Sequence, residues 1–276
     1  MDIEKLIELD KKHFIHPTSS IQDQQAHGPK AIIEKGEGVY LYDITGKKYI
    51  DAMSSLWNVN IGHGNKELGE VAKQQMDQLA FSSCFTTFSH RPAILLAEKI
   101  ASIAPEGLNA VFFTSGGSES NDSAVKLVRH YWIIQGQPER RKIISLSRGY
   151  HGVAAASTSV TGIPEFWGIH AKTHYQRGTE ESIASIRKVI EEEGPETIAA
   201  FIAEPVQGAG GVLIPPEDYF KEIRKLCDEY GILFIADEVI CGFGRTGKMF
   251  GIENFGVTPD LMTFAKGVTS GYIPLG

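Results

Sequence analysis

Residues 198–239 read IAAFIAEPVQGAGGVLIPPEDYFKEIRKLCDEYGILFIADEV. This stretch contains two continuous apolar runs, residues 198–206 and residues 231–239. Between them, near residues 217–230, apolar residues recur at helical spacing. The apolar face of this predicted helix comprises Phe220, Ile223, Cys227 and Tyr230. Apolar runs without alternation are typical of parallel strands covered on both faces, so the stretch predicts a strand, a helix and a second strand of one parallel sheet.

The same order recurs on both sides of this stretch. VFFT at residues 111–114 is predicted as a strand, with a helix at 118–134 and a further strand, KIISLS, at 142–147. Another apolar run, DLMTFAK, occupies residues 260–266. Strands that alternate with amphipathic helices predict the α/β class, with a mostly parallel sheet flanked by helices.

The N-terminal part follows a different pattern. Residues 1–12 are predicted as a short amphipathic helix, and residues 31–52 alternate between apolar runs and turn signals, which favours antiparallel strands. Helical patterns follow at residues 65–79 and 91–104. An α+β segment is therefore expected to precede the parallel sheet.

Composition narrows the function classes. The chain has 276 residues, of which 42% are hydrophobic, and its formal net charge is −7. A negative field repels phosphate backbones and anionic lipids, so neither nucleic acid nor a membrane surface is an expected partner. No apolar segment is long enough to span a bilayer. A small-molecule ligand is favoured instead.

The cysteines and two histidines give no sign of a metal site. Cys84, Cys227 and Cys241 are widely spaced and form no CxxC pair, which favours free thiols in the cytoplasm. His170 and His174 lie four residues apart in HAKTH, but the residue after His170 is Ala where a zinc protease helix has Glu. We expect a surface pair and no metal.

A glycine-rich motif, GFGRTG at residues 242–247, matches GxGxxG after a strand. The residues that follow it, KMFGIENFGVTPD, contain glycines and a proline and lack helical periodicity. A dinucleotide site needs a helix at this point, so a nicotinamide cofactor is disfavoured here.

SGGSES at residues 115–120 lies between a predicted strand and a predicted helix. Two glycines allow backbone N–H groups to approach an anion, Ser118 adds a hydroxyl, and the helix start contributes its dipole. The motif therefore resembles a phosphate cradle. The alternative is an ordinary helix start with Ser118 as its N-cap residue.

Two charged residues lie at the ends of apolar strands. Asp237, in FIADEV, is expected to be desolvated and to need a cationic partner, such as a protonated ring nitrogen, or else backbone donors in a turn. Lys266, in TFAKG, is expected to have the lowered pKa that suits Schiff-base chemistry, unless it extends to solvent. After a third strand, Tyr150 in RGYHG either stacks on a flat cofactor or packs against its loop.

Three longer stretches carry a family resemblance: AAFIAEPVQGAGGVLIPPEDYF (199–220), FIADEVICGFGRTGKMFG (234–251) and PDLMTFAKGVTSGYIPLG (259–276). Together they resemble class III aminotransferases, which depend on pyridoxal 5'-phosphate (PLP) and have the fold of type I PLP-dependent transferases. The resemblance extends from Gly38 to Gly276. It implies an N-terminal segment, residues 1–62, that belongs to a smaller domain, and a large PLP-binding domain, residues 63–276.

The resemblance also implies roles for the residues at the strand ends. Lys266 would bind the cofactor covalently and then move a proton as a free amine, and Asp237 would keep the pyridine nitrogen protonated. Tyr150 and Val239 would flank the ring, and Glu204 would support the polar network near Asp237.

The phosphate and the substrate are assigned in the same way. Gly116, Gly117 and Ser118 would hold the phosphate, although relatives often have Ser or Thr where this chain has Gly116. Trp57 and Phe85 are candidates for the substrate pocket, with core packing as the equal alternative for Phe85.

Within the family, the chain is most similar to the omega-amino acid and amine:pyruvate group. Ala209 and Ile240 stand where the ornithine and 4-aminobutyrate branches usually have Glu and Gln. The expected reaction transfers an amino group from an amine or omega-amino acid donor to a keto-acid acceptor, pyruvate in the first instance. An alternative is the transfer from S-adenosylmethionine to 8-amino-7-oxononanoate.

Members of the family continue well beyond the lysine, so the chain is expected to be truncated at its C-terminal end. A homodimer or a dimer of dimers is expected for the full-length protein. A non-enzymatic alternative is a fragment that retains only the cofactor half.

Overall fold

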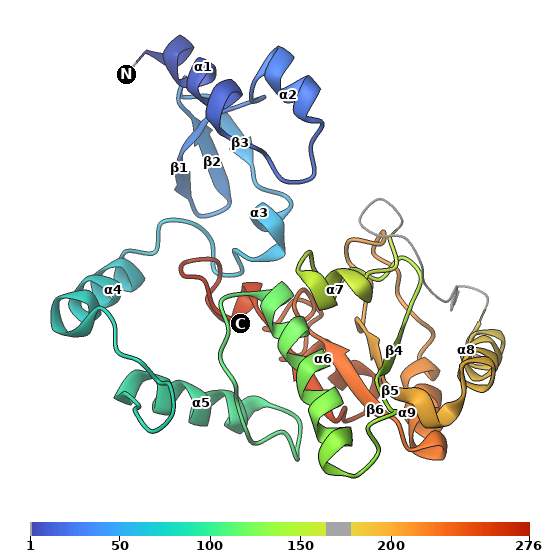
Figure 1. Ribbon diagram of the computed structural model, residues 1–276. Coiled ribbons are helices and arrows are strands. Elements are labelled where there is room, and N and C mark those ends of the chain that lie inside the picture. The colour runs from blue at the N-terminus through green and yellow to red at the C-terminus, as the bar shows by residue number, and fades with distance from the viewer. Residues whose placement is uncertain (1, 164–177) are drawn as a thin grey trace.

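The structure is a computed structural model, and it describes residues 2–163 and 178–276 (Figure 1). His170 and His174 lie outside the described residues. Figure 1 shows an N-terminal module at the top, a group of helices at the left, and an α/β part at the right. Within the described ranges, every helix is too short or too polar to cross a lipid bilayer.

The N-terminal module combines two helices with an antiparallel sheet of order β1-β2-β3. Its elements are α1 (Ile3–His13), α2 (Ile21–His27), β1 (Ile33–Glu37), β2 (Tyr40–Asp43) and β3 (Lys48–Ile50). Asp43 fixes the turn between β2 and β3, because its Oδ1 accepts hydrogen bonds from the backbone N–H groups of Thr45 (2.9 Å) and Lys47 (3.0 Å). These bonds and those from the Thr45 and Tyr49 hydroxyls lower the pKa of Asp43 to about 2. The predicted helix and antiparallel strands are confirmed.

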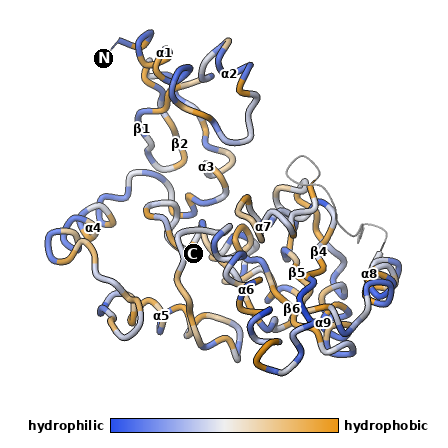
Figure 2. The backbone as a smooth tube through the Cα atoms, viewed as in Figure 1, coloured by the Kyte–Doolittle hydropathy of each residue, from blue (hydrophilic) through white to orange (hydrophobic). Residues whose placement is uncertain are grey.

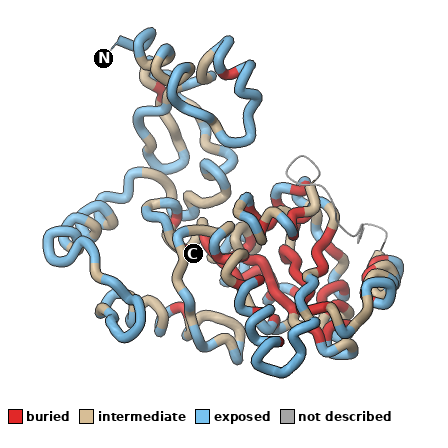
Figure 3. The backbone as a smooth tube through the Cα atoms, in the orientation of Figure 1, coloured by how far each residue is buried: buried red, intermediate tan, exposed pale blue. Residues whose placement is uncertain are grey.

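Three helices connect this module to the α/β part: α3 (Ser54–Trp57), α4 (Lys66–Leu79) and α5 (Arg91–Ile103). Side chains cap the two longer helices, since Oδ1 of Asn65 accepts from the N–H of Leu68 and Nδ1 of His90 accepts from the N–H of Ala93. Both helices match the predicted ranges. Figure 3 shows that most of α4 and α5 is exposed.

The α/β part is built on a parallel sheet of order β4-β5-β6-β7. The strands are β4 (Lys142–Ser145), β5 (Ile198–Ala203), β6 (Leu233–Asp237) and β7 (Leu261–Thr263). All six residues of β5 are buried, because helices cover both faces of the sheet. Figure 2 shows apolar residues along the central strands and mixed residues on the surrounding helices. The predicted parallel sheet is confirmed.

Successive strand residues point to opposite faces and join two separate cores. On one face α6 (Gly117–Ile134) packs Val128 and Trp132 against Ile202, and the indole N–H of Trp132 donates to the carbonyl of Ala199 (2.9 Å). On the other face α8 (Thr179–Glu193) and α9 (Tyr219–Tyr230) pack against Phe201. Helices α2, α3, α7 (Ala155–Ser159) and α8 are additional to the elements predicted from sequence.

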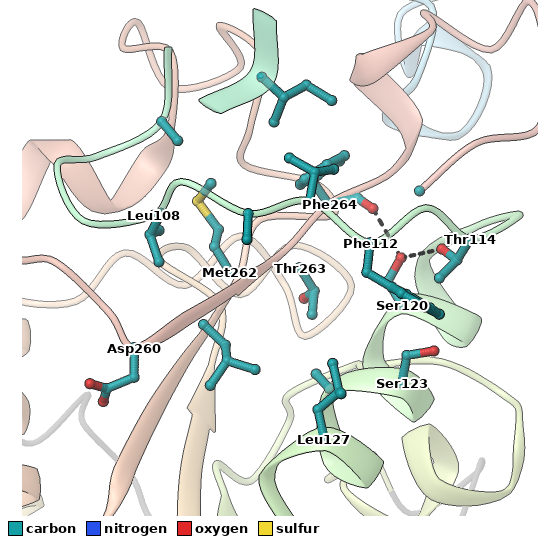
Figure 4. Close-up of a pocket in the computed structure, with 17 residues that line it drawn as sticks. Leu108, Phe112, Thr114, Ser120, Ser123, Leu127, Asp260, Met262, Thr263 and Phe264 are labelled. Atoms are coloured by element: carbon teal, nitrogen blue, oxygen red, sulfur yellow. Dashed lines mark hydrogen bonds between the residues drawn. The ribbon is translucent and has the colours of Figure 1, made fainter. Parts of the chain in front are cut away.

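The predicted strand VFFT at residues 111–114 is wrong. Among the described residues, only Thr114 in this segment forms a backbone pair with another extended residue, exchanging bonds of 2.8 and 2.9 Å with Gly276. A cavity of about 170 Å³ lies between the segment, α6 and β7, with Phe112 and Met262 in its wall (Figure 4). A strand requires a hydrogen-bonded neighbour, and residues 111–113 have none in the described part of the chain.

Candidate active site

The residues predicted to carry chemistry gather at the carboxyl edge of the parallel sheet. Asp237 is the last residue of β6, and Glu204 directly follows β5. Tyr150 lies in the loop after β4, and Lys266 begins the short 3-10 helix η4 (Lys266–Val268) after β7. Loops at this edge of an α/β sheet form its ligand-binding crevice, because the strands end there side by side.

Asp237 is 2% exposed and both of its carboxylate oxygens accept hydrogen bonds. Oδ2 accepts from Nδ2 of Asn121 (2.8 Å) and lies 2.7 Å from Nδ1 of His151, while Oδ1 accepts from the N–H of Val239 (3.0 Å). An ionised carboxylate only accepts, so Nδ1 of His151 carries the proton of that bond. These donors compensate the desolvation of a buried charge.

Asn121 and His151 are site residues that the sequence patterns did not single out. Asn121, in α6, also donates to the carbonyl of His151 (2.7 Å) and accepts from the hydroxyl of Thr263 (2.7 Å). It therefore joins α6, the loop after β4, β6 and β7 in one network. Their positions in the sequence could have identified both residues, because Asn121 directly follows SGGSES and His151 directly follows Tyr150.

The electrostatics of His151 reflect two opposed effects. Burial disfavours the imidazolium, but the hydrogen bond to Asp237 and the charges of Asp237 and Glu204 outweigh it, so the pKa of His151 is raised. Nε2 of His151 is buried and has no hydrogen-bond partner among the described residues. The imidazole therefore acts on the site through Nδ1.

Glu204 fixes two loops at once. Its Oε1 accepts from the N–H of Tyr150 (3.0 Å) and its Oε2 accepts from the N–H of Gly208 (2.9 Å). Burial raises the pKa of Glu204 to about 7, and the nearby charge of Asp237 acts in the same direction. The carboxyl group thus positions the backbone of Tyr150 over the sheet edge.

The start of α6 has the form of an anion cradle. Its N-cap residue is Gly116, not Ser118, and no side chain caps the helix there. A Cβ atom on Gly117 would lie 2.7 Å from Cγ1 of Val239, so only glycine allows this approach. The hydroxyl of Ser118 accepts from the N–H of Val153 (3.2 Å). The first N–H groups of an 18-residue helix are therefore available at the sheet edge.

Lys266 has an unusual backbone and an unpaired amine. Its φ angle is 44°, in the left-handed region, and its Nζ has no hydrogen-bond or ion-pair partner among the described residues. Burial lowers its pKa and outweighs the opposing charges of Asp237 and Glu204. A lysine in this state is a nucleophile at lower pH than an exposed one.

The two residues predicted for the substrate pocket are not brought together. Trp57 lines a cavity of about 440 Å³ together with Gly208 and Ile240. Phe85 is 80% exposed in the loop between α4 and α5, and it does not line that cavity. The exposure of Phe85 excludes core packing within the described residues, and its role in a substrate pocket stays a prediction.

The GxGxxG motif at residues 242–247 forms a series of turns. The next element is the short 3-10 helix η3 (Gly251–Phe255), and Glu238 caps it by accepting from the N–H groups of Gly251 (2.8 Å) and Ile252 (2.7 Å). Burial raises the pKa of Glu238 to about 7. The motif therefore leads into a 3-10 helix, and three of its six residues are exposed.

Comparisons with known proteins find close relatives of this chain. A putrescine–pyruvate aminotransferase of Pseudomonas aeruginosa is 45% identical over 97% of this chain and 63% of its own length. A transaminase from the marine bacterium Virgibacillus is 72% identical, with a TM-score of 0.97 over 99% of this chain and 63% of that one. An omega-transaminase of Pseudomonas jessenii in complex with PMP is 44% identical, with a TM-score of 0.92 over 98% of this chain and 64% of that one.

This chain thus spans about 63% of the length of the first two of these relatives. The structural likeness confirms the predicted fold of PLP-dependent transferases. Residues 21–276 match the aminotransferase class-III family, to which this chain belongs.

Proposed function

We propose that this protein is a PLP-dependent transaminase that moves an amino group from an amine or omega-amino acid to a keto acid. The observation that carries this proposal is the unpaired amine of Lys266 on the same sheet edge as the buried carboxylate of Asp237 and the open start of α6. Membership of the class III aminotransferase family supports it.

PLP has three polar functional groups, namely an aldehyde, a basic ring nitrogen and a phosphate. The residues present fit all three. Lys266 would hold the aldehyde carbon, and Asp237 would face the ring nitrogen. The phosphate would lie on the N–H groups of residues 116–118, where Gly117 is required by the close approach of Val239. Tyr150 and Val239 would flank the ring.

When bound, PLP supplies an electron-accepting ring conjugated to the substrate carbon. Asp237 would keep a proton at the ring nitrogen, because its carboxylate is fixed by His151 and Asn121. Once the donor amine has displaced it from the aldehyde carbon, the free Nζ of Lys266 would take a proton from the amine-bearing carbon of the donor, which its lowered pKa favours at neutral pH. Glu204 keeps Tyr150 in place through the backbone.

Borohydride reduction followed by mass spectrometry tests the cofactor assignment. We expect the pyridoxyl adduct on Lys266, no adduct in Lys266→Ala, and a normal adduct in Lys248→Ala, which removes an exposed lysine of the turns after β6. An adduct on another lysine, or none in the wild-type protein, would overturn the proposal.

For the substrates we propose pyruvate as the acceptor, supported by the name of the Pseudomonas aeruginosa relative and by Ala209 and Ile240. A side-by-side assay with pyruvate and 2-oxoglutarate tests this, with putrescine and beta-alanine as donors. Preference for 2-oxoglutarate, or for S-adenosylmethionine with 8-amino-7-oxononanoate, would refute the subgroup and leave the class intact.

We further propose a homodimer in the cytoplasm. Large apolar side chains are exposed around α4 and α5, and burying them against a second copy would remove them from water: Met76, Phe81, Phe85, Phe88 and Ile94. Cys84, Cys227 and Cys241 are free thiols, as a reducing compartment favours. Sedimentation of the native protein as a monomer would contradict the dimer.

A further inference from the structure

A segment near the N-terminus lies directly against the loop that carries Lys266. We call residues 58–65 the brace and residues 266–272 the lysine loop. Oγ of Ser270, which is buried, accepts a hydrogen bond from the N–H of Ile61 (3.0 Å). The two residues are 209 positions apart in sequence. The N-terminal segment and the lysine loop are therefore joined by a specific contact.

The hydroxyl of Tyr272 makes a second connection. It donates to the carbonyl of Gly62 (2.9 Å) and accepts from the N–H of Asn65 (2.8 Å). Asn65 is the N-cap residue of α4, so one side chain of the lysine loop ties together the brace and the start of a helix.

Asn60 makes the third connection, at the residue next to the lysine. A Cβ atom on Gly267 would lie 2.6 Å from Nδ2 of Asn60, so the two groups are in close contact. Nδ2 donates to the carbonyl of Phe243 (3.0 Å), and Oδ1 accepts from Nη2 of Arg245 (2.7 Å). The amide of Asn60 is thus fixed on both sides while it lies against the backbone that follows Lys266.

The lysine loop needs such support because its backbone is strained. Lys266 has φ 44° and Ser270 has φ 52°, both in the left-handed region that residues with a Cβ atom disfavour. Conformations of this kind persist only where surrounding contacts determine them. The brace supplies contacts at Gly267, Ser270 and Tyr272, which lie immediately beyond Lys266.

We propose that the brace holds Lys266 in its left-handed conformation and thereby aims its amine at the sheet edge, with Asn60, Ser270 and Tyr272 as positioning residues. The catalytic role of the Lys266 amine rests on the proposed function, but the role of the brace in orienting that amine does not. If Lys266 relaxes to an ordinary backbone conformation, its Cα–Cβ bond points elsewhere and the amine becomes solvated. Its pKa then returns toward the ordinary value of 10.5.

The test measures the titration of Lys266 in the cofactor-free native protein, by competitive acetylation across pH and mass spectrometry of each lysine peptide. Tyr272→Phe and Ser270→Ala each remove one connection. The matched control is Tyr230→Phe, whose hydroxyl bonds to Arg187 and Glu191 (both 3.1 Å) far from the site. We expect the titration of Lys266 to move upward in both brace variants and to stay unchanged in the control.

Amide hydrogen exchange provides a second measurement on the same samples. In Tyr272→Phe we expect exchange across residues 266–272 to accelerate by roughly tenfold or more, because both hydrogen bonds of the Tyr272 hydroxyl are lost. A variant that melts at a lower temperature but leaves the titration of Lys266 unchanged would show a merely structural contact and overturn the proposal. Because no cofactor is present, this outcome is independent of the pyridoxyl adduct that tests the proposed function.

Discussion

Nδ1 of His151 lies 2.7 Å from Oδ2 of Asp237, and both side chains are buried. With Asn121 as the second donor to Oδ2, the remaining acceptor capacity of Asp237 is on Oδ1, which accepts from the N–H of Val239 and from no other described residue. The bond between His151 and Asp237 therefore leaves Oδ1 as the oxygen that can accept from a cation in the crevice.

Replacing His151 by Phe should destabilise the protein by about 1.5–3 kcal/mol, the range for a hydrogen bond to a charged group. The pKa of His151 is raised in the folded state, so its contribution is fully present below about pH 6.5, the unfolded value, and is lost as pH rises through the folded value. Urea unfolding from pH 5.5 to 9 measures this, with His130→Phe on the exposed side of α6 as the control. A destabilisation that does not fall with pH would contradict the ion pair.

Glu204→Gln should change how the free energy of unfolding depends on pH. A salt-bridged acid makes a protein more stable as pH rises, whereas the buried Glu204 makes it less stable. The pKa of Glu204 is about 7 in the folded state against 4.5 ordinarily, so the folded state binds more protons between these values and wild-type stability falls as pH rises. Gln does not ionise. Relative to wild type, the variant should gain roughly 3 kcal/mol of unfolding free energy between pH 4 and pH 8. The exposed Glu217→Gln serves as the control, and a pH-independent difference would count against a desolvated Glu204.

Asp237→Asn should still form the pyridoxyl adduct and lose most of its turnover. A neutral amide does not keep a ring nitrogen protonated, and a loss of about 4 kcal/mol of transition-state stabilisation corresponds to roughly a thousandfold fall in rate. Stopped-flow measurement of each half-reaction checks it. Turnover near that of the wild type would mean that Asp237 serves the fold alone.

Gly117→Ala and Gly116→Ala form a matched pair. A Cβ atom on Gly117 would lie 2.7 Å from Cγ1 of Val239, whereas one on Gly116 would meet nothing within 4 Å. Overpacking of this kind costs about 1–3 kcal/mol, so in cofactor-free protein only the Gly117 variant should lose stability. Adding Val239→Ala should restore most of it. Equal stability of the two single variants would place the start of α6 farther from Val239.

The sequence predicts the parallel sheet well because burial on both faces imposes a local signal, the continuous apolar runs of β5 and β6. The same runs place Asp237 and Lys266 at the carboxyl edge, since a charged residue that ends an apolar strand stands out. The roles of these residues stay predictions, as does the domain division after residue 62.

What the sequence does not predict depends on partners that are distant along the chain. VFFT has a strand composition, but pairing and not composition makes a strand. His151 and Asn121 reach Asp237 across 86 and 116 residues, and no local pattern reports such a contact. Phe85 was assigned to the pocket by resemblance, yet its position is set by the long loop between α4 and α5.

The brace also sets an order of events during folding. Its hydrogen bonds from Ile61 to Ser270 and from Tyr272 to Gly62 span 209 and 210 residues. Contacts between residues so far apart in sequence form late in folding, because the chain between them must first be organised. We therefore expect the parallel sheet to form before Lys266 reaches its left-handed conformation, so the position of the lysine amine is among the last features of the fold to be fixed.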